Sequence, residues 1–176
     1  MTKRSAGLLM FRRSAEKVEV LLVHVGGPFW EKKDLAAWSL PKGEYAEGED
    51  AFATAMREFE EETSLRPDGD FILLGQIRQP SGKWVTAWAF ESDCDPAAIK
   101  SNLFSMEWPK GSGKMQEFPE IDRGEWFTLG AARPKILKGQ IGFLERLAAH
   151  LGISIASDAA ATGGDNDASS QGSLFG

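Results

Sequence analysis

The stretch "PKGEYAEGEDAFATAMREFEEETSL", residues 41–65, places a run of acids on what otherwise reads as an amphipathic helix. Projection at about 100° per residue gives one apolar sector, suited to face a core, and an adjoining acidic sector. The apolar sector holds Phe52, Ala55, Met56 and Phe59, and the acidic sector holds Glu58, Glu61 and Glu62. The stretch therefore predicts a core-packed helix that begins near Glu49 and Asp50 and carries three carboxylates on one face.

The repulsion between the acids on this face requires compensation by positive charge. Like charges three or four residues apart on a helix repel each other, and the negative end of the helix dipole adds to the cost. Arg57 and Lys42 supply part of the compensation, and a divalent cation bound by the carboxylate oxygens supplies more. Ligation by oxygen alone suits magnesium or manganese better than zinc. The alternative is that the acids only form a solvated helix face.

The composition limits the number of domains and the kinds of site that the chain can form. A chain of 176 residues, 42% of them hydrophobic, builds one ordinary core and predicts one domain. The only cysteine is Cys94 and the only histidines are His24 and His150, so neither an internal disulfide nor a thiolate or imidazole metal cluster is expected. A net charge of −6 argues against binding duplex nucleic acid through its phosphates.

The chain divides into a body and a tail. No apolar run approaches the roughly 20 residues of a membrane span, and the apolar run near the N-terminus is too short for a signal peptide. A soluble, cytoplasmic protein without a membrane partner is therefore expected. Residues 153–176 are rich in Ala, Gly, Ser and Asp, a composition that cannot bury enough apolar area to offset its ordering entropy. We expect a folded domain over 1–152 and a flexible tail over 153–176.

Within the body, strand and helix patterns are mixed without regular alternation. The patterns predict paired strands at 6–11 and 18–25, an extended segment at 37–43, a hairpin from 70–78 and 83–91, a helical turn at 95–101 capped by Asp95, strands at 102–108 and 125–129 separated by a long loop at 109–124, and a closing helix at 140–152. This mixture favours an α+β fold, an α/β/α sandwich around a mixed sheet, over a doubly wound parallel sheet.

The spacing of residues in the opening stretch resembles the Nudix box, G-x5-E-x7-R-E-U-x-E-E-x-G-U, in which U is aliphatic or aromatic. The matching positions hold Gly43, Glu49, Arg57, Glu58, Phe59, Glu61, Glu62 and Leu65. Ser64 departs from the pattern, which has glycine there. Because that glycine allows a left-handed backbone at the helix C-terminus, a serine is expected to cost roughly 1 kcal/mol of stability and to leave the metal site intact.

The resemblance covers roughly residues 5–150 and implies the Nudix fold, an α/β/α sandwich. It is closest to bacterial predicted nucleotide pyrophosphohydrolases and to asymmetric diadenosine tetraphosphate hydrolases. It implies a magnesium- or manganese-dependent hydrolase that cleaves a phosphoanhydride bond in a nucleotide or dinucleoside polyphosphate. Two alternatives remain: a hydrolase of a non-nucleotide diphosphate, such as an inositol or sugar derivative, and a Nudix-like domain that only binds its ligand.

The resemblance also implies roles for residues in and before the helix. Glu58 and Glu62 are the surest metal ligands, with Glu61 beside them. A backbone carbonyl of Lys42 or Gly43 would complete the inner shell, where a residue without Cβ permits close approach. A structural role is expected for Arg57, which can hold Glu49 or Glu61 and so fix the loop to the helix.

The general base differs among branches of the family. Glu58 is one candidate, and Glu120 is the other, because it lies six residues before Trp126, as a functional glutamate does in diadenosine tetraphosphate hydrolases. Glu117 is its rival in the same loop. The alternative is that Glu120 is an ordinary exposed loop acid.

Substrate recognition must come from outside the box. The candidate substrate-binding residues are Trp38, Lys42, Arg78, Lys83 and Trp84, with Lys110 and Lys114 as further phosphate contacts in a loop that can close over a polyphosphate. The alternatives are that the tryptophans are core residues and that the lysines only confer solubility. His24 and His150 are expected to be structural.

The end of the tail, "QGSLFG", carries large apolar residues in a polar segment. Gln171, Leu174 and Phe175 resemble the short peptide by which bacterial replication and repair proteins bind the sliding DNA clamp. Gly172 departs from the leucine common in second place, which would weaken such a contact. The alternative is an inert or locally docked tail.

Overall fold

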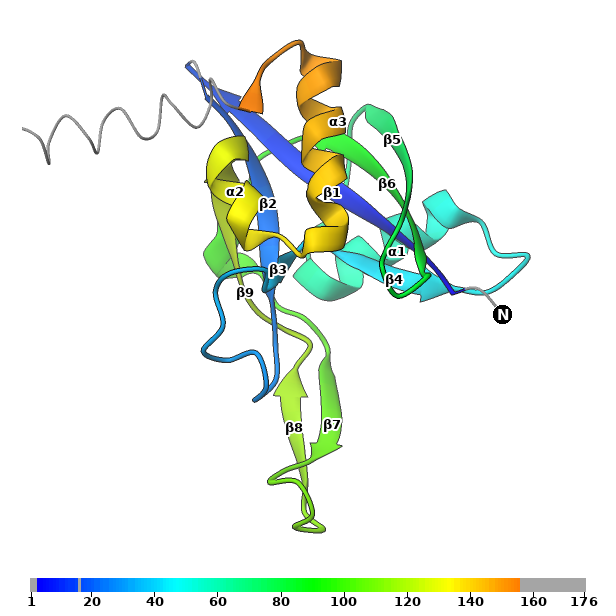
Figure 1. The fold of residues 1–176 in the computed structure, drawn as a ribbon, viewed down its shortest axis with the longest axis vertical. Helices are drawn as coiled ribbons and strands as arrows, with labels where there is room; N and C mark the ends of the chain where they lie inside the picture. Colours follow the sequence, from blue (N-terminus) through cyan, green and yellow to red (C-terminus); the bar gives the residue numbers. More distant parts are fainter. Residues whose placement is uncertain (1–2, 16, 156–176) are drawn as a thin grey trace, which may run out of the picture.

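The computed structural model describes residues 3–15 and 17–155, which form a sheet-centred body with one projecting hairpin (Figure 1). The strands are β1 (Arg4–Ser14), β2 (Lys17–Val25), β3 (Trp38–Ser39), β4 (Lys42–Tyr45), β5 (Phe71–Arg78), β6 (Trp84–Glu91), β7 (Leu103–Glu107), β8 (Met115–Pro119) and β9 (Ile121–Thr128). The helices are α1 (Ala51–Thr63), α2 (Leu129–Lys135) and α3 (Ile141–Leu151), and 3-10 turns span Pro96–Ala98 and Lys138–Gln140.

The main sheet is mixed. Its path runs β3-β2-β1-β6-β5, with β4 paired to β1 and β9 paired to β2. The β1–β6 pair is parallel and the other pairs are antiparallel. This confirms the predicted α+β fold, a sandwich of helices around a mixed sheet.

Strand β1 is buried on both faces, which explains its continuous apolar run "AGLLMF". Successive side chains of a strand point to opposite faces. Leu8 therefore packs into a cluster with Phe59 of α1, while Leu9 packs into a second cluster with Leu144 of α3. The two clusters are the two halves of the core, one on each side of the sheet.

The sheet opens at one place, and this opening positions the acidic helix. The first part of β1 pairs with β4 and its last part pairs with β2. The segment 38–45 thus lies between two strands that have parted. Gly7 makes the close approach possible, since a Cβ there would lie 2.5 Å from the carbonyl oxygen of Pro41. Buried Gln140 accepts from the Leu40 N–H at 3.1 Å and anchors this segment from the other face.

Helix α1 begins and ends as its sequence indicates. Asp50 is the N-cap and accepts from the Ala53 N–H at 2.9 Å. Ser64 ends the helix in the left-handed conformation, with φ of 64°, as expected for a residue in the glycine position of the box. Its hydroxyl donates to the Lys100 carbonyl at 2.7 Å, a bond that offsets part of the expected strain.

Several predicted elements are confirmed. Strands β5 and β6 form the expected antiparallel hairpin, and the turn at Pro96–Ala98 is capped by Asp95. The prediction of an unstructured loop over 109–124 was wrong. Met115–Pro119 forms β8 and pairs with β7 in a hairpin that projects from the body, and β9 begins at Ile121 (Figure 1). Helix α2 was not predicted, because Pro134 lies inside it.

The packed body extends slightly past the predicted domain boundary at 152. Ile153 and Ile155 pack against the core, and the Ile153 N–H donates to the Ala148 carbonyl at 2.9 Å. The proposed clamp-binding residues of the tail, Gln171, Leu174 and Phe175, lie outside the described residues. Among the helices of residues 3–15 and 17–155, none has the length and apolar character to cross a membrane.

Candidate active site

The acidic face of α1 packs against the segment that enters the helix. The carboxyl carbon of Glu58 lies 2.1 Å from the position that a Cβ on Gly43 would occupy. Any side chain at position 43 would therefore displace this carboxylate. Glu62, one turn further along, accepts a hydrogen bond from the backbone N–H of Lys42. The absence of a side chain at Gly43 thus allows the helix carboxylates to lie directly on the backbone of β4.

Arg57 lies beside the same cluster. Its guanidinium nitrogens are each 3.8 Å from a carboxylate oxygen of Glu49, Glu58 and Glu61. Glu49 in turn accepts from the Ala46 N–H at 2.7 Å. Arg57 therefore connects the loop before α1 to two helix carboxylates, which is the arrangement expected of a residue that holds the site together.

Glu120 joins the cluster from a segment about sixty residues away. Its carbonyl accepts from the Gly26 N–H at 2.9 Å and its N–H donates to the Asn102 carbonyl at 2.9 Å. Its charge reaches both Glu58 and Glu62. Glu117 instead lies opposite Ser105 on the exposed side of the β7–β8 hairpin. The structure therefore brings Glu120, and not its rival, to the helix carboxylates.

Burial, with a smaller contribution from mutual repulsion, raises the pKa values of two of these acids. Burial, then the charge of Glu61, raises the pKa of Glu58, while Arg57 opposes the shift. Burial raises the pKa of Glu62 to about 8, against the opposing charge of Lys42. The pKa of Lys42 is lowered, first by its own burial and then by the charge of Lys83. Among the described residues, Arg57 and Lys42 thus offset only part of the shift, since the pKa of both acids stays raised.

The residues present suit a hard divalent cation. The available donors are carboxylate and carbonyl oxygens, Glu62 is half-buried with a raised pKa, and Gly43 leaves the backbone open to close approach. In the described part of the chain, no three His, Cys, Asp or Glu side chains converge into a finished metal cage. Cation binding therefore requires the carboxylates to turn toward a common point. Their mutual repulsion opposes this movement when no cation is bound.

The basic candidates for substrate binding fall in two places. Lys83 pairs with Glu44 at 3.0 Å, and its charge acts on Lys42 beside the carboxylates. Arg78 lies over the ring of Trp84, 6.0 Å from the ring centroid, at the end of the β5–β6 hairpin. Lys42 and Lys83 thus lie next to the carboxylate cluster, whereas Arg78 and Trp84 pack on each other.

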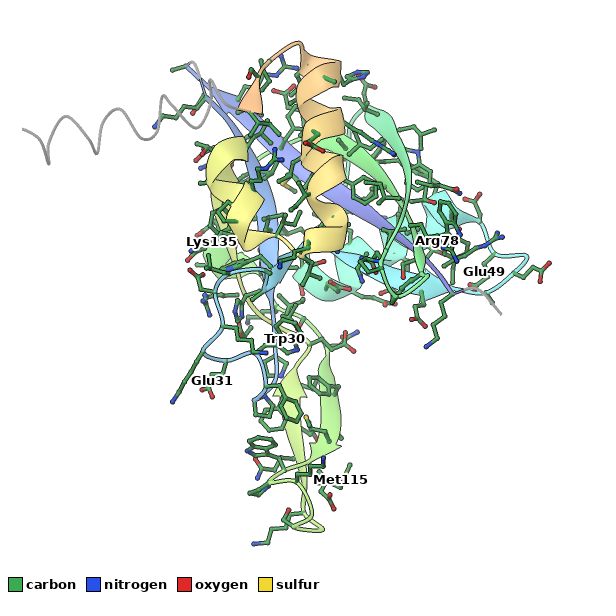
Figure 2. All side chains as sticks on the ribbon, viewed as in Figure 1. Trp30, Glu31, Glu49, Arg78, Met115 and Lys135 are labelled. Atoms are coloured by element: carbon green, nitrogen blue, oxygen red, sulfur yellow. The ribbon has the colours of Figure 1, made fainter. Side chains whose placement is uncertain are left out.

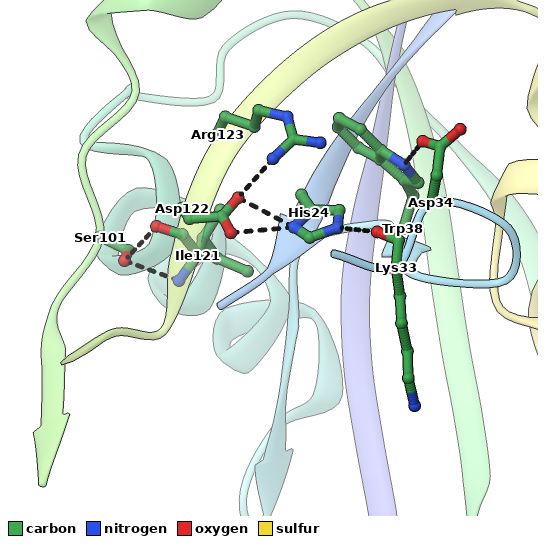
Figure 3. Close-up of polar contacts among 8 residues, drawn as sticks. All are labelled: His24, Lys33, Asp34, Trp38, Ser101, Ile121, Asp122 and Arg123. Atoms are coloured by element: carbon green, nitrogen blue, oxygen red, sulfur yellow. Dashed lines mark hydrogen bonds and ion pairs between the residues drawn. The ribbon is translucent and has the colours of Figure 1, made fainter. Parts of the chain in front are cut away.

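The expectation that Trp38 binds substrate was wrong. Its side chain is buried in the core, where its ring meets His24 edge-on at a centroid distance of 5.0 Å. Its indole N–H donates to Asp34 at 3.1 Å, and Arg123 covers its ring (Figure 3). The neighbouring apolar residues Ala37 and Leu40 are buried as well, so Trp38 belongs to a continuous core segment.

A buried polar network holds the segments that carry the site. His24 is fully buried, and its Nδ1 lies 2.9 Å from Asp122 while its Nε2 donates to the Lys33 carbonyl at 2.6 Å (Figure 3). Asp122 lies two residues after Glu120. The network therefore ties β2 to β9 and to the loop over 26–37, and it gives His24 the structural role that its sequence context predicts.

One cavity beside the cluster was missed by the sequence interpretation. It has a volume of about 410 Å³ and lies between the start of the 26–37 loop and the β7–β8 hairpin. Its lining includes Phe29, Trp30, Phe104, Met106 and Glu120. The only sequence signal for it is the apolar alternation in "FSMEW", which predicted a strand without indicating what the strand faces.

Comparison with known proteins agrees with this geometry. A family model described as NUDIX domain matches residues 1–147. A Bifidobacterium longum protein named nucleoside triphosphate pyrophosphatase/Nudix hydrolase fusion protein is 30% identical over 106 residues, which cover 57% of this chain and 21% of that protein. An asymmetrical bis(5'-nucleosyl)-tetraphosphatase of Caenorhabditis elegans is 35% identical over 65 residues, which cover 37% of this chain and 43% of that protein. The chain thus spans less than half the length of either relative.

Solved structures share the fold. A C. elegans Ap4A hydrolase binary complex superposes with a TM-score of 0.57 at 23% identity, covering 84% of this chain and 98% of that one. The NUDIX domain of Shewanella oneidensis NrtR, solved with ADP ribose, superposes with a TM-score of 0.58 at 17% identity, covering 86% and 89%. At these identities the likeness concerns the fold alone.

Proposed function

The chain belongs to the Nudix family, and from this premise we propose that it is a magnesium-dependent hydrolase that cleaves a phosphoanhydride bond in a nucleotide or a dinucleoside polyphosphate. One observation supports this above the others. Glu58 and Glu62 of α1 lie against the backbone of Lys42 and Gly43, the charge of Glu120 acts on both, and the pKa of each acid is raised although Arg57 and Lys42 oppose the shifts. Such a cluster suits a site where a cation and a diphosphate bind together.

The chain's oxygen donors provide for the cation. Glu58 and Glu62 would hold it, with Glu61 beside them and a backbone carbonyl of Lys42 or Gly43 completing the set. Manganese has the same preference for oxygen ligands and is the alternative ion. When bound, the cation supplies charge that neutralises the anionic oxygens crowding the phosphorus.

The remaining residues position and deprotonate the attacking water. Glu120 accepts a proton from the water as its oxygen bonds to phosphorus, and the bond from phosphorus to the bridging oxygen breaks, so that oxygen leaves with the departing phosphate. Glu58 is the alternative base. Lys42 and Lys83 lie where they can pair with phosphate oxygens, and Arg57 keeps the helix carboxylates oriented through its contact with Glu49.

The nucleotide class rests on the named activities of the relatives, a nucleoside triphosphate pyrophosphatase fusion protein and a bis(5'-nucleosyl)-tetraphosphatase. Substrate-binding roles for Arg78 and Trp84, a cytoplasmic location and contact of the tail with a sliding clamp stay predictions from the sequence.

The test is a substrate panel. Nucleoside triphosphates, dinucleoside polyphosphates, nucleotide sugars and inositol pyrophosphates are each incubated with the full chain and magnesium, and products are identified by chromatography. We expect mononucleotide products from a nucleotide or dinucleoside polyphosphate. Turnover of inositol pyrophosphates alone would favour the non-nucleotide class, and no turnover of any member would favour a domain that only binds its ligand.

A further inference from the structure

The aromatic cavity next to Glu120 is built from two separate segments. One wall is the start of the loop after β2, with Phe29 and Trp30, and the other is strand β7, with Phe104 and Met106. Figure 2 shows Trp30 where the projecting hairpin meets the body. The cavity therefore exists only because the β7–β8 hairpin stands against this loop.

The hairpin presents one side to the cavity and the other to solvent. Residues two apart in a strand share a face, so Phe104, Met106 and Trp108 lie together and are half-buried. Leu103, on the opposite face of the same strand, is 57% exposed. The alternation of burial along β7 thus separates residues that build the cavity from a neighbour that does not.

The aromatic walls are held by specific contacts. A Cβ on Gly27 would lie 3.0 Å from the ring of Phe104, so this ring rests directly on the loop backbone. Phe104 also lies 6.0 Å, centroid to centroid, from Phe118 of β8. Phe29 meets the ring of Trp108 edge-on at 5.3 Å and is still 56% exposed. These rings are positioned, yet the lip of the cavity stays open to solvent.

Glu120 is common to the cavity and to the carboxylate cluster. It lines the cavity, and its charge acts on Glu58 and Glu62. When one part of a ligand fills the cavity, the part attached to it therefore lies next to the site where the phosphoanhydride bond would be cleaved.

The lining selects the chemistry of the ligand. Its volume of about 410 Å³ falls in the range of small-molecule pockets. Its walls are aromatic rings, a thioether and glycine backbone, which suit a flat apolar group and offer few partners for the hydroxyls of a polyol. We propose that this cavity binds the nucleobase of the substrate between the 26–30 loop and the β7–β8 hairpin. This inference rests on the proposed function and narrows it toward base-bearing diphosphates.

The test measures binding, without need of turnover. Calorimetry is performed on the full chain carrying Glu58→Gln to prevent hydrolysis, with ATP as the base-bearing probe and tripolyphosphate as its base-free counterpart. Each is titrated into Phe104→Ala, Phe29→Ala and the control Leu103→Ala in that background. Because stacking of a base on an aromatic side chain contributes appreciably, we expect the dissociation constant for ATP to rise about tenfold or more in both phenylalanine variants. The tripolyphosphate constant should stay within about twofold of the parent, and Leu103→Ala should change neither.

Two outcomes would overturn the proposal. One is an unchanged ATP affinity in Phe104→Ala and Phe29→Ala. The other is equal weakening of ATP and tripolyphosphate by Phe29→Ala, whose exposed side chain can be removed without unfolding the hairpin. Neither outcome depends on the substrate panel, so a failure of the hydrolase assignment and a failure of the base pocket are distinguished.

Discussion

The carboxyl group of Glu58 occupies the space that a side chain on Gly43 would need, with its carboxyl carbon 2.1 Å from the position of the missing Cβ. These residues belong to different elements, α1 and β4, which pack closely only because position 43 has no side chain. The backbone at Gly43 does not require glycine for its own conformation, since its φ is not in the left-handed region. The requirement comes from Glu58.

Gly43→Ala should therefore damage the site more than the fold. The added methyl group must displace the Glu58 carboxylate, so we expect kcat to fall by about 100-fold, on the order of 3 kcal/mol of transition-state stabilisation. Steady-state kinetics with circular dichroism as a check on folding measures this. Gly48→Ala is the matched control. Its residue has φ of 91° with nothing within 4 Å of a Cβ, so it strains the backbone without touching Glu58. Equal kinetic losses in both variants would contradict the explanation.

Glu62→Gln should change how stability depends on pH. The folded-state pKa of Glu62 is about 8, above the ordinary value of 4.5. The folded state therefore binds the proton more tightly than the unfolded state, so this contribution to stability is present below about pH 4.5 and is lost as the pH rises through 8. In the presence of a chelator, the unmodified chain should lose stability between pH 5 and 8 relative to Glu62→Gln, as measured by urea unfolding.

Glu60→Gln is the control for that measurement, since it makes the same change of charge at an exposed position on the same helix. Added magnesium should raise the melting temperature of the unmodified chain and of Glu60→Gln at pH 8, but not that of Glu62→Gln. A parallel pH dependence in all three proteins would show that the pKa of Glu62 is not raised in the folded state.

Two substitutions of Ser64 distinguish the cost of backbone strain from the stabilisation by a hydrogen bond at the end of α1. Ser64→Gly removes the strain of a left-handed residue, worth about 1 kcal/mol, but also removes a hydrogen bond of similar worth to the Lys100 carbonyl, so little net change is expected. Ser64→Ala keeps the strain and loses the bond, and its melting temperature should fall by about 2–4 °C. Thermal unfolding measures both. A stabilised alanine variant would show that the bond contributes nothing, and kcat should be near normal in either case.

Asp122→Ala should loosen the segment that carries Glu120. It leaves the buried Nδ1 of His24 without the carboxylate that faces it, a loss of about 2 kcal/mol and about 4–8 °C in melting temperature. Because Glu120 lies two residues away, kcat should fall as well. Asp93→Ala, which removes an exposed carboxylate paired with Arg12 at 2.9 Å, should change the melting temperature little and leave kcat unchanged. Equal effects of the two changes would argue against the network.

Much of the fold could be predicted because local and tertiary preferences agree. In α1 the apolar sector that defines the helix also faces the core, with Ala55 and Phe59 fully buried. The β5–β6 hairpin follows from two β-rich runs around "QPSG", since a short turn requires its flanking strands to pair. The helix carboxylates could be grouped from sequence for the same reason, because their neighbourhood is set by helical spacing.

What could not be predicted depends on contacts far apart in the chain. Glycine, proline and lysine in 109–114 indicate a loop, so the pairing of β7 with β8 could not be predicted from the sequence and is seen only in the structure. Trp38 is polar enough at its indole N–H to suit either a core or a binding site, and its burial follows from contacts with Asp34 and Phe127. The aromatic cavity needs Phe29 and Phe104 to meet, and no spacing rule connects two residues so distant in sequence.

We propose that Glu58 and Glu62 hold a divalent cation and that Glu120 serves as the base for phosphoanhydride hydrolysis. The most direct test is the initial rate of mononucleotide release from the best substrate of the panel, measured against magnesium concentration for the unmodified chain and for Glu62→Gln. We predict a rate that rises with magnesium to saturation, disappears in excess chelator, and is lower by about 100-fold or more in Glu62→Gln, on the order of 3 kcal/mol. A rate that survives the chelator, or a normal magnesium-dependent rate in Glu62→Gln, would rule out this metal site.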